Sequence, residues 1–252
     1  MLTNLSKHFN KSPETVTGEE LKQYLYHSRQ TRQLSNAFVN QTISAVKILH
    51  RDVLGLDWDN QIKIKRPRRE QPLPDILSKE EVLRMVEVTA NLKHKSIIAL
   101  LYSSGIRREE MLNLLLSDLD SKRMVIRINM GKGKKTRDAL LAVNTLELLR
   151  QYYKKFHPRP IKYVFEAGYN PGHPYSASSV GNVVKRAALN AGIKKQIHPH
   201  SLRHAFATHM LEQGTNLKII QKLLGHSTLR STMVYLHLAS IDPSVKSPFD
   251  QI

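Results

Sequence analysis

The sequence predicts a mainly α-helical protein with one small antiparallel β-sheet, an α+β fold built as two domains. Apolar residues recur at helical spacing through most of the 252 residues. Alternation typical of a strand appears at 124–130, where the glycine-rich turn 131–134 leads into a returning strand at 135–142. We therefore expect a helical N-terminal domain at 1–62, a linker at 63–77, a larger domain with the sheet at 78–238, and a polar C-terminal tail at 239–252.

Composition indicates a polyanionic partner and excludes several kinds of site. The 39 Lys and Arg residues outnumber the 21 Asp and Glu residues, which gives a formal net charge of +18. Such a charge attracts polyanions such as nucleic acid. Cysteine is absent, which excludes disulfides, thiolate nucleophiles and cysteine metal sites. No apolar run reaches the roughly 18 residues of a membrane span, and the N-terminus lacks the apolar core of a signal peptide, so we expect a cytoplasmic protein without a membrane partner.

Two helices are expected in the N-terminal domain. Thr17 with Glu20 forms a capping box that opens a helix to about Arg29. Ser35 is the candidate cap of a second helix, which stops near Gly55. The domain is short, and both a DNA-clamping domain and an inert helical cap are compatible with this pattern.

The linker is basic and rich in proline. Prolines at 67, 72 and 74 favour an extended backbone and prevent a continuous helix. An extended basic segment can lie along a phosphate backbone, although a solvated spacer has the same composition. The candidate DNA-binding residues of the linker are Lys63, Lys65, Arg66, Arg68 and Arg69.

Capping and stop signals divide the larger domain into helices. An apolar helix at 94–104 ends at Gly105, and Arg107 then stands at the start of the next helix. Unpaired backbone N–H groups at a helix start favour an anion, so Arg107 is a candidate for an anion site. The other helix starts are predicted at Ser78 with Glu81, at Asn144 with Glu147, and at Ser178 or Ser179.

The segment 197–235 holds the densest group of reactive side chains. His200 and Arg203 are three residues apart, so they lie on one face of a helix that stops before Gly214. We expect His204 and His209 to face differently from His200 and interpret them as structural or DNA-facing residues.

Two shorter helices are expected after Gly214. The helix at 217–224 ends at a glycine, and His226 follows in the turn. Ser227 is the predicted N-cap of a third helix, which carries Tyr235. Arg203, two imidazoles and a phenol are thus presented by helices around one point, which is a suitable arrangement for holding and attacking a phosphate.

The order of these motifs resembles that of the tyrosine recombinase family, which includes phage integrases and Xer-type recombinases. The nine-residue interval from His226 to Tyr235 suits the family's pattern. The resemblance covers 78–238 as the catalytic domain and, more weakly, 1–62 as the core-binding domain. The matching motifs are Gly105-Ile106-Arg107 with Glu110, Gly131-Lys132-Gly133, His200-Ser201-Leu202-Arg203-His204, Leu224-Gly225-His226, and Tyr235.

The resemblance implies that the Tyr235 phenol attacks a DNA phosphate, forms a 3′-phosphotyrosyl link and frees a 5′ hydroxyl. Because this link stores the bond energy, no cofactor, ATP or metal is implied. Guanidiniums suit the equatorial phosphate oxygens, and a phenol with an ordinary pKa of about 10 needs a base or a strong field. We assign Arg107 and Arg203 to the phosphate oxygens, His200 to the phenol proton, Lys132 to protonating the leaving oxygen, His226 to a phosphate oxygen, and Glu110 to orienting His200 or Arg203.

Three functions are compatible with the sequence. The first is a site-specific recombinase of double-stranded DNA, a homo-tetramer in its synaptic complex and a monomer in solution. The second is a DNA relaxer like a type IB topoisomerase, and the third is a catalytically idle DNA-binding protein. The complete set of polar catalytic groups argues against the third, and a tail at 239–252 that docks on a neighbouring subunit would favour the first over the second. Integration, excision, inversion and dimer resolution all stay open.

Overall fold

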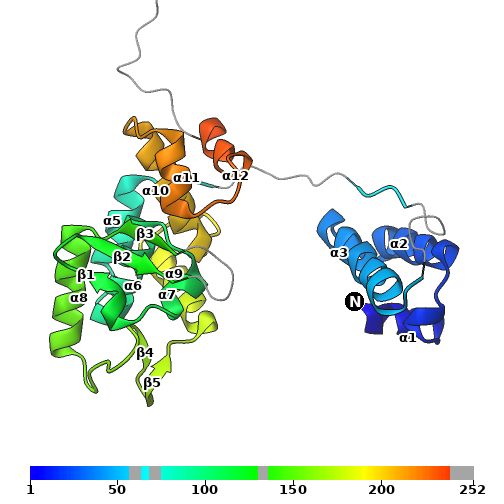
Figure 1. The fold of residues 1–252 in the computed structure, drawn as a ribbon, viewed down its shortest axis with the longest axis horizontal. Helices are drawn as coiled ribbons and strands as arrows, with labels where there is room; N and C mark the ends of the chain where they lie inside the picture. Colours follow the sequence, from blue (N-terminus) through cyan, green and yellow to red (C-terminus); the bar gives the residue numbers. More distant parts are fainter. Residues whose placement is uncertain (57–63, 68–74, 130–135, 239–252) are drawn as a thin grey trace, which may run out of the picture. The chain divides into compact units, whose positions relative to one another are not determined.

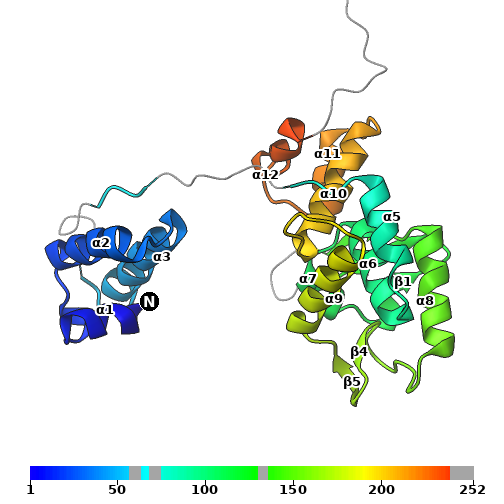
Figure 2. The same ribbon diagram turned by 180° about the vertical axis from the view of Figure 1, so that it is seen from behind.

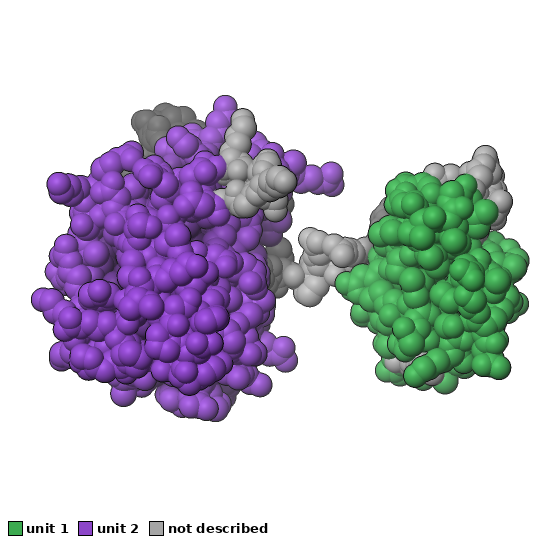
Figure 3. Space-filling model, turned by 60° about the horizontal axis from the view of Figure 1, so that its bottom comes forward, with its two compact units in different colours: residues 1–72 green, residues 73–252 purple. Residues whose placement is uncertain are grey.

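The computed structural model describes residues 1–56, 64–67, 75–129 and 136–238. The chain divides into two compact units, Met1–Pro72 and Leu73–Ile252, which Figure 3 distinguishes by colour. No helix in these described ranges is long and apolar enough to cross a bilayer.

The N-terminal unit is a small helical bundle, as the sequence predicts (Figures 1 and 2). The Thr17–Glu20 capping box is present, and the Ser35 hydroxyl accepts a hydrogen bond from the Phe38 N–H. The second predicted helix is not uniform to Gly55, because its last turns widen into a π-helix. The elements are α1 (Leu2–Phe9), η1 (Pro13–Thr15), α2 (Gly18–Arg32), α3 (Asn36–Lys47) and η2 (Ile48–Val53).

Part of the predicted linker belongs to the N-terminal unit. The Asn40 side-chain amide donates to the Pro67 carbonyl at 3.1 Å, and the Arg66 guanidinium donates to the Ser44 hydroxyl at 3.1 Å. Ile64 packs against the core of the same unit, while Leu77 is fully buried in the other unit. The linker is therefore shorter than the predicted 63–77 at both ends, because Ile64 packs on the core of the first unit and Leu77 is buried in the core of the second. Lys63, Arg68 and Arg69 lie outside the described residues.

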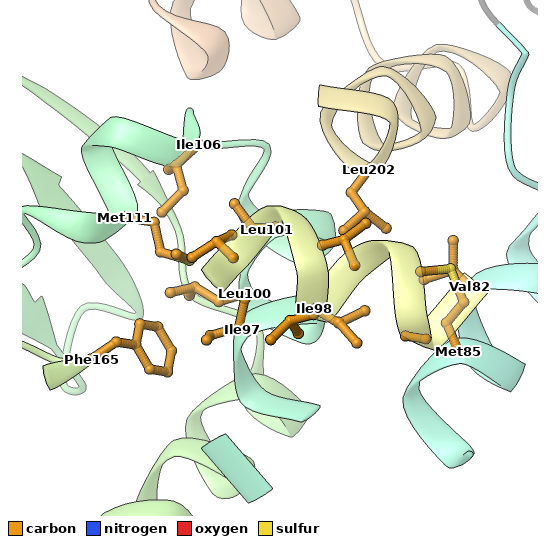
Figure 4. Close-up of a cluster of buried hydrophobic side chains, with 14 of the residues drawn as sticks. Val82, Met85, Ile97, Ile98, Leu100, Leu101, Ile106, Met111, Phe165 and Leu202 are labelled. Carbon is orange, nitrogen blue, oxygen red and sulfur yellow. The ribbon is translucent and has the colours of Figure 1, made fainter. Parts of the chain in front are cut away.

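The second unit is built around one buried helix, α6 (Leu92–Ser104). The five consecutive residues from Ile97 to Leu101 are all buried, Ala99 at 9% exposure and the other four fully, so apolar residues point to every side of this part of α6 (Figure 4). A helix that is apolar all round is stable only inside a core. The helices that share this core are α5 (Lys79–Glu87), α7 (Arg108–Leu112), α8 (Val143–Lys155), α9 (Ala177–Asn190) and α10 (Pro199–Glu212).

The predicted antiparallel pair is present and has a third strand. Strand β2 pairs with β1 and β3, and its pairs with β3 run from Val125–Leu140 to Ile128–Arg137. Both strands are shorter than expected, and β2 starts one residue late because Met124 has a positive φ of 54°. The described strands of this sheet are β1 (Leu119–Asp120), β2 (Val125–Ile128) and β3 (Arg137–Leu140); a separate hairpin joins β4 (Glu166–Ala167) to β5 (Asn170–Pro174), and η3 (Leu116–Asp118) precedes β1.

Three short elements complete the unit after α10. They are α11 (Leu217–Leu224), α12 (Arg230–Met233) and η4 (Val234–His237), and they lie together at one end of the unit in both ribbon views (Figures 1 and 2). Helix α11 packs on α10, on α12 and on strand β3. This packing brings α11 and the turn after it to the strand that carries Arg137.

Three of the predicted helix caps are wrong, although the helices exist. Helix α9 is capped by Ser176, whose hydroxyl accepts from the Ser179 N–H at 3.0 Å, rather than by Ser178 or Ser179. Helix α8 starts after Ala142 with no side-chain cap, so Asn144 and Glu147 form no box. Helix α12 begins after Leu229 and not after Ser227. In each case a residue of the type that caps helices lay within three positions of the true start, a distance that local pattern alone does not resolve.

Candidate active site

Arg203 is the most enclosed charged residue of the site. Its guanidinium donates to the Gly105 carbonyl at 2.6 Å and to the Leu224 carbonyl at 2.7 Å, and the residue is only 4% exposed. These carbonyls end α6 and α11, where the helix dipole places partial negative charge. Burial, and then the charge of Arg107, lowers the pKa of Arg203 to about 10, so it is still a cation at neutral pH.

Gly105 makes this arrangement possible. Its φ of +61° ends α6 in the left-handed region, and a Cβ at this position would lie 2.3 Å from Phe206 Cδ1. The Phe206 ring and the Arg203 guanidinium both come from α10, so Gly105 lets α10 approach the end of α6 closely.

Arg107 is held beside Arg203 but is open to solvent. Its Nη1 donates to Glu110 Oε1 at 2.8 Å, and its backbone N–H donates to Glu110 Oε2 at 2.8 Å. Its Nη2 lies 3.4 Å from the Gly225 carbonyl. The Arg107 side chain is 35% exposed, against 11% for Glu110. Arg107 is therefore the guanidinium that an anion can reach directly.

Glu110 holds two arginines and not the residues that we expected. Its second partner is Arg137 on β3, which donates Nη1 to Oε1 at 3.1 Å and Nη2 to Oε2 at 2.8 Å. The prediction that Glu110 orients His200 or Arg203 is wrong, because a carboxylate three residues after Arg107 on α7 reaches back to that helix start. Burial alone would raise the pKa of Glu110, but the hydrogen bonds from Arg137 and Arg107 outweigh burial and lower it.

Arg137 is a site residue that sequence reasoning missed. It lies 27 positions from Glu110, a separation that no local motif bridges. The strand alternation did contain a signal, because Arg137 and Ala139 point to the same face of β3 and Ala139 is buried. An arginine on the inward face of a strand needs a carboxylate or carbonyl partner.

His226 lies in the turn after α11, as predicted, and contacts Arg203. Its Nε2 is 3.0 Å from Arg203 Nη2, and its Nδ1 is 2.9 Å from the Thr232 hydroxyl. Because arginine can only donate, Nε2 must accept, and the ring proton sits on Nδ1 and is donated to Thr232. Burial, and then Arg203 and Arg107, lowers the pKa of His226 to about 4, which keeps the ring neutral.

Tyr235 is buried behind His226. It is 2% exposed and packs in a small apolar cluster with Phe206 and Leu224. Its ring is nearly parallel to that of His226, with centroids 6.4 Å apart and 10° between the planes. Burial raises the pKa of the Tyr235 phenol, and the lowering by Arg203 and Arg107 is smaller.

The phenol hydroxyl shares a hydrogen bond with His204 and not with His200. The Tyr235 hydroxyl lies 3.1 Å from His204 Nδ1. The expectation that His204 faces differently from His200 is wrong, because residues four apart share one face of a helix. His200 is exposed, and burial of part of its ring, followed by the charge of Arg203, lowers its pKa. Burial, and then His200, lowers the pKa of His204 to about 4. His209 has a structural contact, since its Nδ1 lies 2.9 Å from the Tyr102 hydroxyl.

A cleft of about 1020 Å³ opens beside these groups. Arg107, Glu110, Arg137 and His226 lie in its wall, whereas Arg203, His204 and Tyr235 do not. The described residues of its lining include more cations than anions, with Arg107, Arg127, Arg137 and Lys222 against Glu109, Glu110 and Asp118. The cleft can therefore accept an anionic chain that reaches Arg107 and His226 first.

Two groups of predicted site residues are not among the residues of this described cluster. Lys132 is outside the described residues, so its position relative to the cleft is not part of the described geometry. Lys65 and Arg66 are described, and they belong to the N-terminal unit. The described catalytic candidates that the structure brings together are Arg107, Glu110, Arg203, His226 and Tyr235, with His200 one turn before His204 on α10.

Family comparisons agree with the geometry over both units. Residues 75–240 match the model described as the phage integrase family, and residues 1–60 match the phage integrase N-terminal SAM-like domain. A putative integrase/recombinase of Sinorhizobium fredii is 35% identical over 246 residues, which is 97% of this chain and 79% of that protein. The tyrosine recombinase XerD of Oceanobacillus iheyensis is 31% identical, covering 94% of this chain and 84% of that protein.

Solved structures share the same architecture. The crystal structure of the XerA recombinase is 27% identical, with a TM-score of 0.62, and the match covers 94% of this chain and 84% of that chain. A post-cleavage complex of the XerH site-specific recombinase with its palindromic difH substrate shows the same fold at 24% identity, with a TM-score of 0.73 over 94% of this chain and 73% of that chain. The chain belongs to the phage integrase family and is a tyrosine-type site-specific recombinase of the Xer-like kind.

Proposed function

We propose that this recombinase cleaves and rejoins double-stranded DNA through a covalent bond between the Tyr235 oxygen and a 3′ phosphate. The observation that carries this proposal is the convergence of Arg203, His226 and Arg107 on the turn at Gly225, with Tyr235 stacked behind it. Two guanidiniums beside one turn suit a phosphate, because the planar fork of each matches the geometry of phosphate oxygens.

The chemistry follows from the charges. Attack by the phenol oxygen forms an O–P bond and breaks the bond to the 5′ oxygen, which leaves with a proton as a hydroxyl. Negative charge grows on the phosphate oxygens during this step. Arg107, which lines the cleft, would donate hydrogen bonds to these oxygens, and the nearby positive charge of buried Arg203 would stabilise them. Neutral His226 would donate its ring N–H to a phosphate oxygen once DNA replaces its hydrogen bond to Thr232. A preorganised donor of this kind accounts for about 3–4 kcal/mol of transition-state stabilisation. The reverse attack by a 5′ hydroxyl releases Tyr235 and seals a strand.

Proton transfer needs a base and an acid. His204 contacts the phenol, His200 lies one turn before it on α10, and both imidazoles have a pKa below the ordinary value for histidine. We assign His200 as the base that acts with DNA bound, while His204 holds the phenol in the DNA-free protein. Lys132 is the proposed acid for the leaving 5′ oxygen. Since the phenol is buried without DNA, the segment that carries Tyr235 must move before it can meet a phosphate.

The partner and assembly follow from the proposed reaction. Exchange of strands between two duplexes needs four nucleophiles, so we propose a homo-tetramer on paired DNA sites formed from monomers, working in the cytoplasm on the nucleoid. Lys65 and Arg66 are proposed to contact phosphates, together with Lys63, Arg68 and Arg69. The support is the charge of this segment and the net charge of +18.

A nicked suicide duplex tests the function. The duplex would carry the recognition sequence obtained by selection from random DNA, and the short 5′-hydroxyl fragment would diffuse away after cleavage and trap the covalent adduct. We expect an adduct with the wild-type protein and none with Tyr235→Phe, at unchanged DNA affinity; Tyr153→Phe, an exposed tyrosine, is the control. Binding without any adduct would leave only a DNA-binding protein. An adduct without strand exchange between two duplexes would favour a DNA relaxer.

A further inference from the structure

We propose that Arg137 is a positioning residue of the recombination reaction, which aims Arg107 and the His226 turn without touching the DNA itself. This inference rests on the proposed function. All three nitrogens of the Arg137 guanidinium donate hydrogen bonds, and their acceptors lie on two separate helices. The described contacts join α7 and α11 through one side chain of β3.

The first arm of Arg137 fixes Glu110. Two parallel bonds, 3.1 and 2.8 Å long, join the guanidinium to both carboxylate oxygens. Each of these oxygens also accepts one bond from Arg107, one from its side chain and one from its backbone. Without Arg137, both Glu110 oxygens would have room for a second hydrogen bond from the Arg107 guanidinium. Arg137 takes that room.

This sharing decides how much of Arg107 is available to an anion. A carboxylate alone beside a guanidinium forms a bidentate pair, which uses two donors and neutralises the charge. With Arg137 present, one net positive charge remains over the group of two arginines and one glutamate. Arg107 then keeps donors directed to the cleft, and its side chain keeps its 35% exposure.

The second arm of Arg137 builds the turn that presents His226. Its Nε donates to the Leu223 carbonyl at 3.0 Å, in the last turn of α11. Its side chain also passes so close to Gly225 that a Cβ there would lie 2.7 Å from Arg137 Cδ and 2.7 Å from Nε. Gly225 has a φ of +64°, and its carbonyl is the one that Arg107 Nη2 approaches. Arg137 and Gly225 therefore fit together as one unit.

Strand pairing makes Arg137 a rigid anchor. It pairs with Ile128 at the start of the β2–β3 ladder, and its side chain is only 8% exposed. A lysine could keep the charge, but it cannot form the two parallel bonds and the third bond at the same time. We therefore expect the rate of DNA cleavage to depend on the forked shape of the Arg137 guanidinium as well as on its charge.

The test compares Arg137→Lys and Arg137→Gln with Arg123→Gln. Arg123 is a matched control, because its side chain pairs with Asp138, the neighbour of Arg137 on β3, at only 3.7 Å and is 62% exposed. The measurement is the single-turnover rate of adduct formation on the suicide duplex at saturating DNA, with the dissociation constant measured separately. We expect both Arg137 variants to lower the rate about 10- to 100-fold, as outer partners of reactive groups typically do. The dissociation constant should change less than about threefold, and Arg123→Gln should leave both values unchanged.

A double-mutant cycle shows whether Arg137 acts through Glu110. If it does, Arg137→Gln combined with Glu110→Gln should be no slower than the slower single variant. Fully additive losses would overturn the mechanism, and so would wild-type rates in both Arg137 variants. If Arg137→Gln proves unfolded by circular dichroism, Arg137→Lys decides the question alone, since a normal rate for it excludes the need for a fork. Absence of adduct with the wild-type protein would count against the proposed function and not against the role of Arg137.

Discussion

The two halves of the active site are held in very different ways. The guanidinium half, defined as Arg107, Glu110, Arg137 and Arg203, is tied together by ion pairs and by carbonyls at two helix ends. The nucleophile half, defined as the segment from α12 to η4 with Tyr235, has one described hydrogen bond from its reactive oxygen, to His204. The dense half resembles a preorganised receptor for negative charge. The sparse half is suited to movement, which a buried phenol requires before it can attack DNA.

The largest expected effect comes from reshaping the dense half with Arg203→Lys. An ammonium cannot reach the Gly105 and Leu224 carbonyls and His226 together. We expect the rate of adduct formation to fall about 10²- to 10³-fold, with a dissociation constant for DNA that changes only a few-fold. Single-turnover kinetics and a binding titration check this. A large loss of affinity with normal cleavage would mean that Arg203 only binds DNA.

Gly105→Ala should weaken the same half through the fold. The added methyl group would meet the Phe206 ring at 2.3 Å, in a backbone conformation that alanine adopts only with strain. We expect a loss of about 2–4 kcal/mol in the free energy of unfolding, measured by urea denaturation of the full chain. Gly192→Ala is the matched control, since Gly192 also has a positive φ, of 70°, but has open space around it. Equal losses of stability in both variants would mean that the positive φ of the glycine, and not its close contact with the Phe206 ring, accounts for the destabilisation.

His204→Ala probes the sparse half and should have a smaller effect on the chemistry. Removing the imidazole leaves the buried Tyr235 hydroxyl without its partner, which costs about 1–3 kcal/mol of stability. We expect adduct formation to stay within about tenfold of wild type, whereas His200→Ala should slow it about 100-fold or more if His200 is the base. Single-turnover rates of the two variants, side by side, make the comparison. A slower reaction in His204→Ala than in His200→Ala would transfer the role of base to His204.

The most gradual effect is that of pH on stability. His204 and His226 have pKa values of about 4 in the folded protein, below the ordinary 6.5 of histidine. Between these values the unfolded chain binds more protons, so stability is full above about pH 6.5 and decreases as the pH falls toward 4. Thermal midpoints measured from pH 7 to pH 5 should decrease, and His226→Gln should flatten this slope. An unchanged slope in that variant would mean that the pKa of His226 is not lowered on folding.

Local sequence features were sufficient for much of the molecule. The Thr17–Glu20 and Ser78–Glu81 boxes could be predicted because their hydrogen bonds close within four residues. The end of α11 at Gly225 was predictable for the same reason, since a left-handed residue there ends a helix whatever surrounds it. The caps at Ser227 and Asn144 were wrong because the two helices begin after Ala142 and Leu229, which form no side-chain cap, so no local capping signal marks their starts.

The sequence alone determined the family, the two units and the list of candidate reactive side chains, since these depend on residue type and order. Only the tertiary structure decided which of these side chains meet. Arg137 joins Glu110 and Leu223, residues 27 and 86 positions away, and the phenol of Tyr235 chooses His204 over His200. The physical reason is that motif spacing specifies contacts within one element, while contacts between elements depend on how β3, α10 and α11 pack together.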